Sequence, residues 1–194
     1  PRAVVRSWDT ALGGGQSLDS LEIARGIVTA ARSGRGVINL SLGGSRDETI
    51  ELAIEEAVAR GSLVVAASGN DGRAGSPLSY PAATPHVLTV AATDRADQVA
   101  PFSSRSPHVD LAAPGDGIVV ASALSGAWQE ASGTSFAAPI VSSLAALLVE
   151  AHSALRPREL KRLIVGTARR LPLEWAVRQS DCVWKNSSHY SLFQ

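Results

Sequence analysis

Residues 36–70, "GVINLSLGGSRDETIELAIEEAVARGSLVVAASGN", hold two apolar runs on either side of a segment with helical periodicity. The runs "GVINLSLGG" and "SLVVAAS" are nearly continuous in apolar residues, which is typical of strands covered on both faces of a parallel sheet. Between them Ser45 and Glu48 predict a capping box, apolar residues recur at helical spacing, and Gly61 ends the helix. The stretch therefore predicts a strand, a helix and a second strand.

The flanking segments continue this alternation of strands and helices. Upstream, residues 1–8 form a β-branched run typical of a strand, and Asp19 with Glu22 predicts the start of a helix that Gly34 ends. Downstream, "HVLTVAAT" at residues 86–93 predicts another strand. Strands and helices that alternate at this spacing indicate an α/β fold of three layers, with a mostly parallel central sheet and helices on both faces.

The second half of the chain has a different texture. Residues 94–133 contain the short strand-like pieces "QVAPFSS", "VDLAAPG", "IVVASA" and "AWQEAS", which predict loops and hairpins at a sheet edge. Residues 135–155 are apolar almost all round, which predicts a helix buried in the core, and Pro157 suits the first turn of a further helix. We predict one domain over residues 1–170 and an extension of unclear structure over residues 171–194.

Composition narrows the classes of partner. The 18 basic and 18 acidic residues cancel, so we expect neither nucleic acid nor a membrane surface as a partner. The longest apolar run is interrupted by Pro139 and Glu150 and is expected to fall short of a bilayer span. Cys182 is the only cysteine, and the histidines and carboxylates show no metal-ligand spacing. Because the chain lacks methionine and begins with Pro1, we expect further polypeptide upstream.

Ser135, at the start of the predicted buried helix, has two interpretations. A serine in this place is commonly an N-cap that accepts a backbone hydrogen bond. Alternatively it is a nucleophile, because the free N–H groups and positive dipole end of a helix stabilise negative charge beside the hydroxyl. Gly133, which permits close approach, and Pro139, which we place in the first turn where no N–H is lost, favour the nucleophile.

Residues 133–143, "GTSFAAPIVSS", resemble the active-site serine motif of the subtilisin-like (subtilase, peptidase S8 type) serine endopeptidases. Further motifs follow the order of that family: "VINLSLGG" at 37–44, "VVAASGNDG" at 64–72, "YPA" at 80–82 and "FSSRSPHVDLAAPG" at 102–115. The resemblance covers about residues 1–168. It implies that the predicted domain is the C-terminal part of a subtilisin-like catalytic domain.

The resemblance also implies roles for individual residues. Ser135 is expected to attack the peptide carbonyl and form an acyl-enzyme. Asn70, which alone would be an ordinary turn residue, is expected to donate its amide to the oxyanion, together with the Ser135 backbone N–H. The residues expected to bind substrate are Ser41, Leu42 and Gly43 on an edge segment, Ala66, Ala67, Ser68 and Gly69 at a pocket wall, Ser79 near its base, and Gly133 and Thr134 beside the nucleophile. None is charged, which predicts an apolar or broad side-chain preference.

The family's Asp and His motifs do not occur in this sequence. His152 lies seventeen residues beyond Ser135, on the order of 25 Å along a helix, and His86, His108 and His189 are better explained as surface or structural residues. One hypothesis is a serine endopeptidase whose Asp and His come from a segment upstream of residue 1. The alternative is a catalytically inactive subtilase-like fragment, or a scaffold that binds peptides along residues 41–44.

The resemblance implies the remaining properties. The expected partners are a peptide or protein substrate and the missing N-terminal part of the same domain. No cofactor is evident from the residues, and a structural calcium ion is implied by the family alone. A secreted or extracellular location is likewise an expectation from the family.

Overall fold

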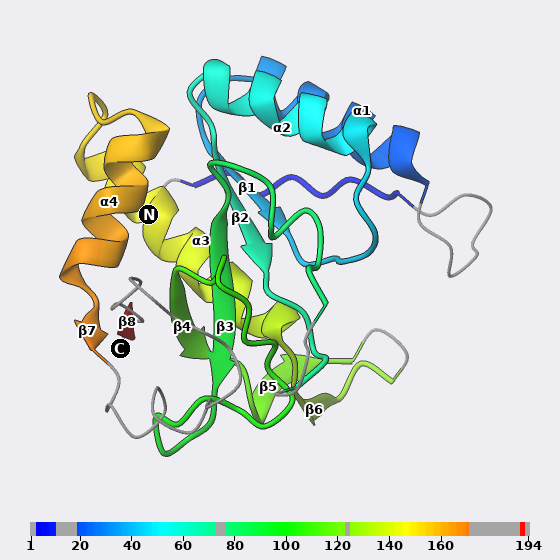
Figure 1. Cartoon of the computed structure of the whole chain (residues 1–194), viewed down its shortest axis with the longest axis vertical. Coiled ribbons are helices and arrows are strands. Elements are labelled where there is room, and N and C mark those ends of the chain that lie inside the picture. The colour runs from blue at the N-terminus through cyan, green and yellow to red at the C-terminus, as the bar shows by residue number, and fades with distance from the viewer. Residues whose placement is uncertain (1–2, 11–18, 73–76, 123–124, 171–190, 193–194) are drawn as a thin grey trace.

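The computed structural model describes residues 3–10, 19–72, 77–122, 125–170 and 191–192, and Figure 1 shows helices on both sides of a central sheet. The helices are α1 (Ser20–Arg32), α2 (Glu48–Ala59), α3 (Thr134–Ala151) and α4 (Pro157–Thr167). The strands are β1 (Val37–Leu40), β2 (Leu63–Ala67), β3 (Leu88–Thr93), β4 (Leu111–Pro114), β5 (Ile118–Ala121), β6 (Trp128–Ala131), β7 (Arg169–Arg170) and β8 (Ser191–Leu192).

The main sheet has the order β1-β2-β3-β4-β8-β7. Strands β1 to β4 are parallel neighbours, with Val37 opposite Leu63 and Val90 opposite Leu111 in the register. β8 pairs in parallel with β4 and antiparallel with β7. Because parallel strands present their carboxyl ends at one edge, the segments that follow β1 and β2 meet there.

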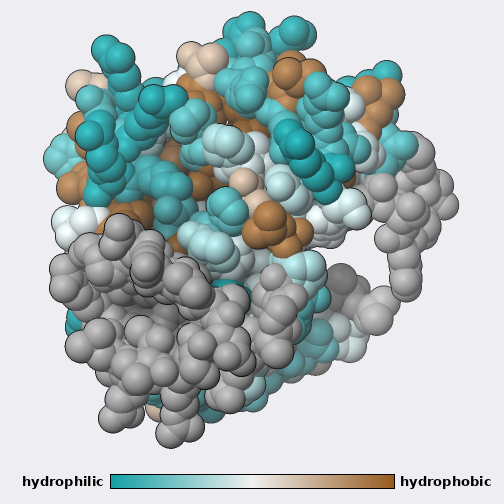
Figure 2. Space-filling view, viewed as in Figure 1, coloured by the Kyte–Doolittle hydropathy of each residue, from teal (hydrophilic) through white to brown (hydrophobic). Residues whose placement is uncertain are grey.

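Two buried clusters separate the sheet from its helical layers and confirm the three-layer α/β prediction. Val64 and Ala66 of β2 pack with α1 and α2, including Ile54, whereas Leu63 and Val65 of the same strand pack with α3 and α4. The alternation of side chains along an extended strand produces this division. Figure 2 shows mainly hydrophilic side chains, with hydrophobic ones between them, over the outer surface of α1 and α2.

The first part of the chain departs from the prediction. The described residues of the 1–8 run form no strand, and Val5 is 92% exposed. Trp8 instead lies against α1, because a Cβ on Gly26 would come within 2.7 Å of its ring. β1 is consequently an edge strand within the described chain, with Asn39 exposed and Leu40 buried. Its two faces are nevertheless both covered, as predicted, because Val37 packs toward α3 and α4 whereas Ile38 and Leu40 pack toward α1 and α2.

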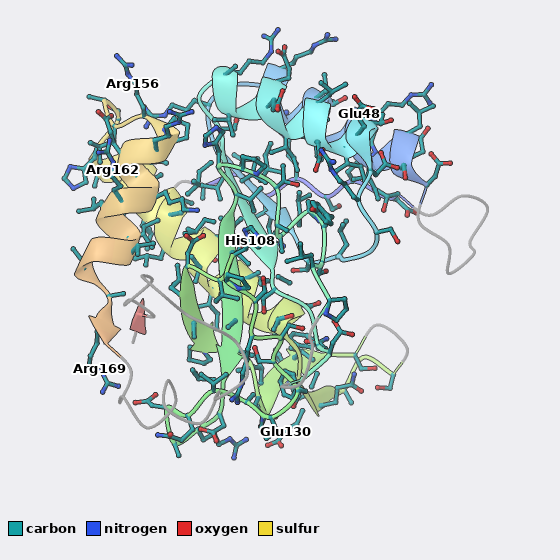
Figure 3. The ribbon with its side chains drawn as sticks, in the orientation of Figure 1. Glu48, His108, Glu130, Arg156, Arg162 and Arg169 are labelled. Atoms are coloured by element: carbon teal, nitrogen blue, oxygen red, sulfur yellow. The ribbon has the colours of Figure 1, made fainter. Side chains whose placement is uncertain are left out.

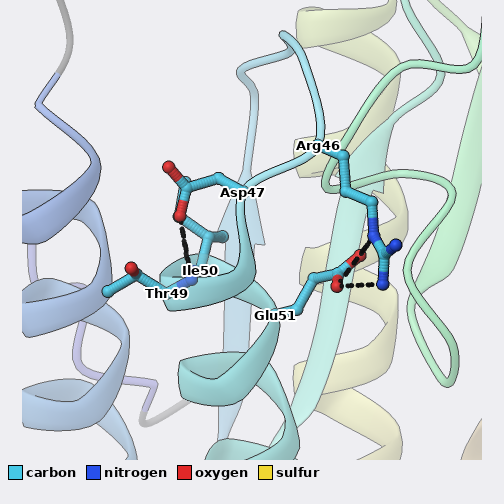
Figure 4. A network of polar contacts seen from close by, with 5 residues as sticks. All are labelled: Arg46, Asp47, Thr49, Ile50 and Glu51. Carbon is cyan, nitrogen blue, oxygen red and sulfur yellow. Dashed lines mark hydrogen bonds and ion pairs between the residues drawn. The ribbon is translucent and has the colours of Figure 1, made fainter.

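Helix α2 is capped by Asp47, and the predicted capping box of Ser45 and Glu48 is wrong. The Asp47 carboxylate accepts hydrogen bonds from the backbone N–H groups of Thr49 at 2.9 Å and Ile50 at 3.2 Å (Figure 4). The Ser20 hydroxyl and these N–H groups hold the pKa of Asp47 below its ordinary value. The cap is two residues later than predicted because the carboxylate satisfies two orphan donors of the first turn.

The beginning of α1 and the end of α2 follow the sequence prediction. The Asp19 carboxylate accepts from the Glu22 N–H at 2.9 Å and caps α1. Gly61 follows α2 with a φ of 91°, a left-handed conformation that glycine adopts without a steric penalty. These two helices thereby cover one face of the sheet and leave the other face to α3 and α4.

Helix α3 begins at Thr134 and is buried on one face only. Ala138 and Val141 are fully buried against the sheet, whereas Ile140 is 40% and Leu147 is 50% exposed, so the prediction of burial all round is wrong. Within the described chain, α3 is the helix long and apolar enough, by length and composition, to cross a membrane, contrary to the expected shortfall. Its small-residue face nevertheless packs on the strands as the core helix of an α/β layer.

The hairpin prediction for the second half is confirmed in part. β5 and β6 pair antiparallel, and "VDLAAPG" contains β4. "QVAPFSS" is not a strand: within it only Val99 forms an isolated bridge, with Thr93. The predicted 171–194 extension lies largely outside the described residues, and the proposed division at residue 170 stays a prediction.

Helix α4 begins at Pro157, as expected from a residue whose missing N–H costs nothing in a first turn. It is joined to the sheet by Lys161, whose Nζ donates to the Val87 carbonyl at 2.6 Å and pairs with the Asp110 carboxylate at 2.7 Å. Arg156 and Arg162 extend outward from this part of the chain, and Glu130 lies on β6 (Figure 3). The charged residues labelled there are exposed.

Candidate active site

The candidate site lies where the chain leaves β1 and β2 and enters α3. Ser41 follows β1 directly, Asn70 follows β2, and Ser135 is the second residue of α3. Helix α3 packs against both strands, so three segments far apart in the sequence converge at one edge of the sheet (Figure 1). This is the edge at which open α/β sheets bind ligands.

Ser135 faces the segment that follows β1. Its Oγ lies 3.5 Å from the Ser41 carbonyl oxygen, a long contact, and the Ser41 hydroxyl donates to the Ser135 carbonyl at 2.9 Å. Ser135 is half-buried and Ser41 is exposed, so the nucleophile predicted from the sequence is reachable from solvent. The pair places a serine hydroxyl beside an exposed backbone edge.

Asn70 is anchored by its oxygen. Its Oδ1 accepts hydrogen bonds from the Thr134 N–H at 2.9 Å and from the Thr134 hydroxyl at 3.0 Å. The Nδ2 amide group lies 3.4 Å from the position that a Cβ on Gly133 would take, directly before the nucleophile's helix. Among the described groups, none accepts a hydrogen bond from Nδ2 or from the Ser135 N–H, which leaves both donors open toward solvent.

Gly69 fixes the approach of this loop. Its N–H donates to the Thr134 hydroxyl at 3.2 Å, and its φ is 103°. A Cβ there would come within 2.9 Å of the Ser104 hydroxyl, so a side chain would meet both strain and a clash. Gly69 therefore holds Asn70 beside α3 through backbone conformation, which fits its predicted place in the site.

The predicted edge segment is paired with Tyr80, the first residue of "YPA". The Gly44 N–H donates to the Tyr80 carbonyl at 2.9 Å, and the Tyr80 N–H donates back at 3.0 Å. Ser79 lies against Gly43, where a Cβ would come within 2.6 Å of its hydroxyl. The structure thus brings Ser79 to the edge segment itself, and glycine at position 43 is required by this close approach.

Of the residues predicted to line a pocket wall, Ala66, Ala67 and Ser68 are buried, and the side chains of Ala66 and Ala67 pack on opposite faces of the sheet. Ala66 packs toward α1 and α2, Ala67 packs toward α3, and Ser68 is 2% exposed with its hydroxyl 3.4 Å from the Ser104 carbonyl. Side chains that alternate across β2 cannot share one wall. Leu42 is half-buried against the α1 and α2 cluster, which leaves Ser41 and Gly43 as the exposed positions of the edge.

No described histidine reaches Ser135. His86 Nε2 contacts Arg158 on α4 at 2.9 Å, the backbone N–H of His108 donates to the Ser106 hydroxyl, and His152 caps the far end of α3. His189 lies outside the described residues. A histidine base for the Ser135 hydroxyl is therefore absent from the part of the chain that the structure describes.

Gly115 is a site residue to which the sequence reasoning gave no role of its own. Its carbonyl accepts from the Gly133 N–H at 2.8 Å. A Cβ at this position would come within 2.7 Å of the Ala92 Cβ and 3.0 Å of the Gly133 carbonyl oxygen. The sequence signal that could have identified Gly115 is its place in "AAPG", directly after a buried strand. A glycine in such a place often marks a point where another part of the backbone approaches closely.

Replacing Gly115 by alanine is expected to lower the free energy of unfolding by about 1–3 kcal/mol, because the added methyl group would clash with Ala92 and the Gly133 carbonyl. Urea denaturation measures the change. Gly36→Ala is the matched control, because nothing lies within 4 Å of a Cβ there. Equal stability of the two variants would show that the Gly115 contact can relax.

Comparison with known proteins assigns this chain to a family. The Subtilase family model (Peptidase_S8) matches residues 4–186. This chain belongs to the subtilase family. It is 39% identical over 150 residues to the cell wall-associated protease of Bacillus subtilis (strain 168), and 37% identical over 150 residues to subtilisin of Bacillus pumilus. These matches cover 77% and 75% of this chain.

Solved subtilase structures share the fold. The prenylagaramide maturation protease PagA gives a TM-score of 0.76 at 32% identity, covering 85% of this chain and 63% of that one. A cold adapted subtilisin-like serine proteinase gives a TM-score of 0.75 at 28% identity, covering 91% and 61%. The chain spans 54% of the Bacillus pumilus subtilisin and 16% of the cell wall-associated protease, so it corresponds to about half or less of these curated relatives.

Proposed function

We propose that this subtilase chain carries the nucleophile and oxyanion site of a serine endopeptidase. In this mechanism the Ser135 Oγ attacks the carbonyl carbon of a peptide bond and its proton passes to a histidine base. The leaving amine then takes that proton as the acyl-enzyme forms, and water releases the acyl group by the reverse sequence. The observation that carries the proposal is the half-buried Ser135 at the start of α3, whose Oγ lies 3.5 Å from the Ser41 carbonyl and whose neighbour Thr134 is bound by Asn70.

The oxyanion site in this proposal consists of two donors. One is the Nδ2 of Asn70, and the other is the Ser135 backbone N–H at the start of α3. Anchoring of Oδ1 by Thr134 fixes the amide plane, so the donor needs no reorganisation when charge develops on the carbonyl oxygen. The positive end of the helix dipole adds to the stabilisation.

The proposed substrate is an extended peptide that lies along the edge segment. Ser41 and Gly43 are exposed and offer backbone groups to a second chain, in the manner of β-augmentation. The predicted pocket residues include no charged side chain, which supports an apolar or broad preference at the residue before the cleaved bond. Removing substrate residues that precede the cleaved bond should weaken binding, because the substrate then loses backbone contacts with the edge segment.

The base is proposed to come from the upstream part of the same domain. The open edge of β1 and the exposed apolar side chains Ile140 and Leu147 on α3 support a covering segment there. The chemistry needs no cofactor. For the structural calcium implied by the family, no cluster of three or more His, Cys, Asp or Glu occurs among the described residues. An extracellular location is proposed on family grounds.

The absence of a histidine beside Ser135 in the described chain favours a second candidate, a subtilase-like scaffold that binds peptides without cleaving them. Labelling with an organophosphonate serine probe separates the two. We expect stoichiometric labelling of Ser135 when the chain is produced together with its native upstream polypeptide, and little labelling of the 194-residue chain alone. Failure of the extended protein to label, with the fold intact by circular dichroism, would contradict the peptidase proposal.

A further inference from the structure

Pro139 lies inside α3, not in the first turn, and this placement leaves the carbonyl of Ser135 without its usual partner. In an α-helix the N–H of residue i+4 donates to the carbonyl of residue i, and the residue four positions after Ser135 is Pro139. The expectation that no N–H is lost at this proline is therefore wrong. The orphaned carbonyl belongs to the proposed nucleophile itself.

The Ser41 hydroxyl supplies the missing donor. Its Oγ donates to the Ser135 carbonyl at 2.9 Å, across from β1 to α3. Ser41 is held in turn by Asn39, whose Nδ2 donates to the Ser41 Oγ at 2.9 Å. The Asn39 Oδ1 accepts from the Ser142 hydroxyl at 2.9 Å, so the chain of contacts returns to α3 about two turns beyond Ser135.

We infer that Asn39 is a positioning residue, and that the Ser142–Asn39–Ser41 chain sets the orientation of Ser135 in place of the helical hydrogen bond that Pro139 removes. The inference rests on the proposed function for its catalytic meaning. Asn39 and Ser41 lie on the edge that carries the proposed substrate, so the same contacts fix the distance between substrate backbone and nucleophile. A misplacement of about 1 Å at a reacting atom costs roughly a hundredfold in rate.

The two serines on α3 provide a matched pair for the test. Both Ser142 and Ser143 contact the carbonyl four residues before them, at 2.9 Å and 2.8 Å, but of the two only Ser142 contacts Asn39. The single proton of the Ser142 hydroxyl is shared between Asn39 Oδ1 and the Ala138 carbonyl, so Ser142→Ala removes both contacts. Ser143→Ala removes only the contact with the Pro139 carbonyl. Ser142→Thr keeps the hydroxyl and is the conservative rescue.

The first readout is the rate of phosphonate labelling in the extended protein, resolved into probe affinity and the maximal rate of inactivation. We expect Asn39→Ala and Ser142→Ala each to lower the maximal rate about ten- to a hundredfold with little change in affinity, and Ser143→Ala and Ser142→Thr to match the parent. Asn39→Asp should behave like Asn39→Ala, because a carboxylate accepts but does not donate and would draw the Ser41 hydroxyl away from Ser135.

Pro139→Ala tests the cause. With an N–H restored at position 139, the Ser135 carbonyl no longer depends on Ser41, so Asn39→Ala should lower the labelling rate less in that background than in the parent. A residue that merely stabilised the fold would show the same loss in both backgrounds. Equal losses would therefore overturn the inference, as would equal labelling of Ser142→Ala and Ser143→Ala.

A second readout does not depend on catalysis. In the 194-residue chain, the carbonyl carbon resonance of Ser135 is expected to shift in Asn39→Ala and Ser142→Ala and to stay in place in Ser143→Ala. An unchanged resonance in the first two variants would overturn the hydrogen-bond chain. If the extended parent protein fails to label at all, the peptidase proposal fails, and the Ser135 resonance still decides whether Asn39 orients this residue.

Discussion

Replacing Ser135 by alanine is expected to reduce peptide hydrolysis by the extended protein about a millionfold in kcat, the size known for the nucleophile of subtilisin and carried over from that relative. Within α3 the change removes one oxygen from a half-buried position near Ser41. The Ser41 contact to the Ser135 carbonyl stays, because it uses the backbone. Catalysis therefore fails through loss of the attacking atom and not through loss of structure.

The measurement is release of a chromogenic leaving group from a peptide substrate, with urea unfolding followed in parallel. Ser143→Ala serves as the control on the same helix, because its hydroxyl only contacts the Pro139 carbonyl. We expect that control to keep its rate and both variants to unfold within about 0.5 kcal/mol of the parent. Retention of more than a thousandth of the activity in Ser135→Ala would identify another nucleophile.

The order of strands and helices could be predicted because their signals are local. β2 is a continuous apolar run, β3 is apolar apart from Thr89 and Thr93, and every residue of both strands is buried. α1 carries a carboxylate cap at Asp19, and its apolar residues share one face. Such patterns depend on neighbours in the sequence. The central strands and their covering helices follow from them without knowledge of long-range contacts.

Features that depend on distant partners were predicted poorly. The run at residues 1–8 has the composition of a strand, yet pairing requires a neighbouring edge, and Trp8 packs on Gly26 instead. α3 is apolar all round, but its outer face has no cover within the described chain, so Ile140 and Leu147 stay exposed. Periodicity shows which face of a helix is apolar, but it does not show whether another part of the chain covers that face.

The candidate site was predicted from motifs, and the contacts that support it were not. The converging positions of Ser135, Asn70 and Ser41 follow from motifs that end at one sheet edge. Pro139 is the sixth residue of α3, so its missing N–H falls inside the helix and not in the first turn where the motif reading put it. Asn39 gave no sequence signal, because an asparagine in a strand is informative only once its contacts with Ser41 and with Ser142 of α3 are known.

Asn70 allows the donor role of its amide to be separated from its anchoring role. Asn70→Asp keeps an oxygen that accepts from the Thr134 N–H and hydroxyl, but it loses the Nδ2 donor and adds a negative charge beside the developing oxyanion. Asn70→Ala loses anchor and donor together. We expect Asn70→Ala to lower kcat about a hundred- to a thousandfold, the size known for the oxyanion asparagine of subtilisin, and Asn70→Asp to lower it at least as much.

The split between kcat and KM decides whether that reasoning holds. The oxyanion exists only after attack, so both substitutions should leave KM within about a factor of three while kcat falls. The free energy of unfolding should fall less in Asn70→Asp than in Asn70→Ala, because Asn70→Asp retains the hydrogen bonds to Thr134 that Asn70→Ala lacks. If Asn70→Asp were nearly as active as the parent, Nδ2 would not be the donor, and Asn70 would be reduced to the cap of α3.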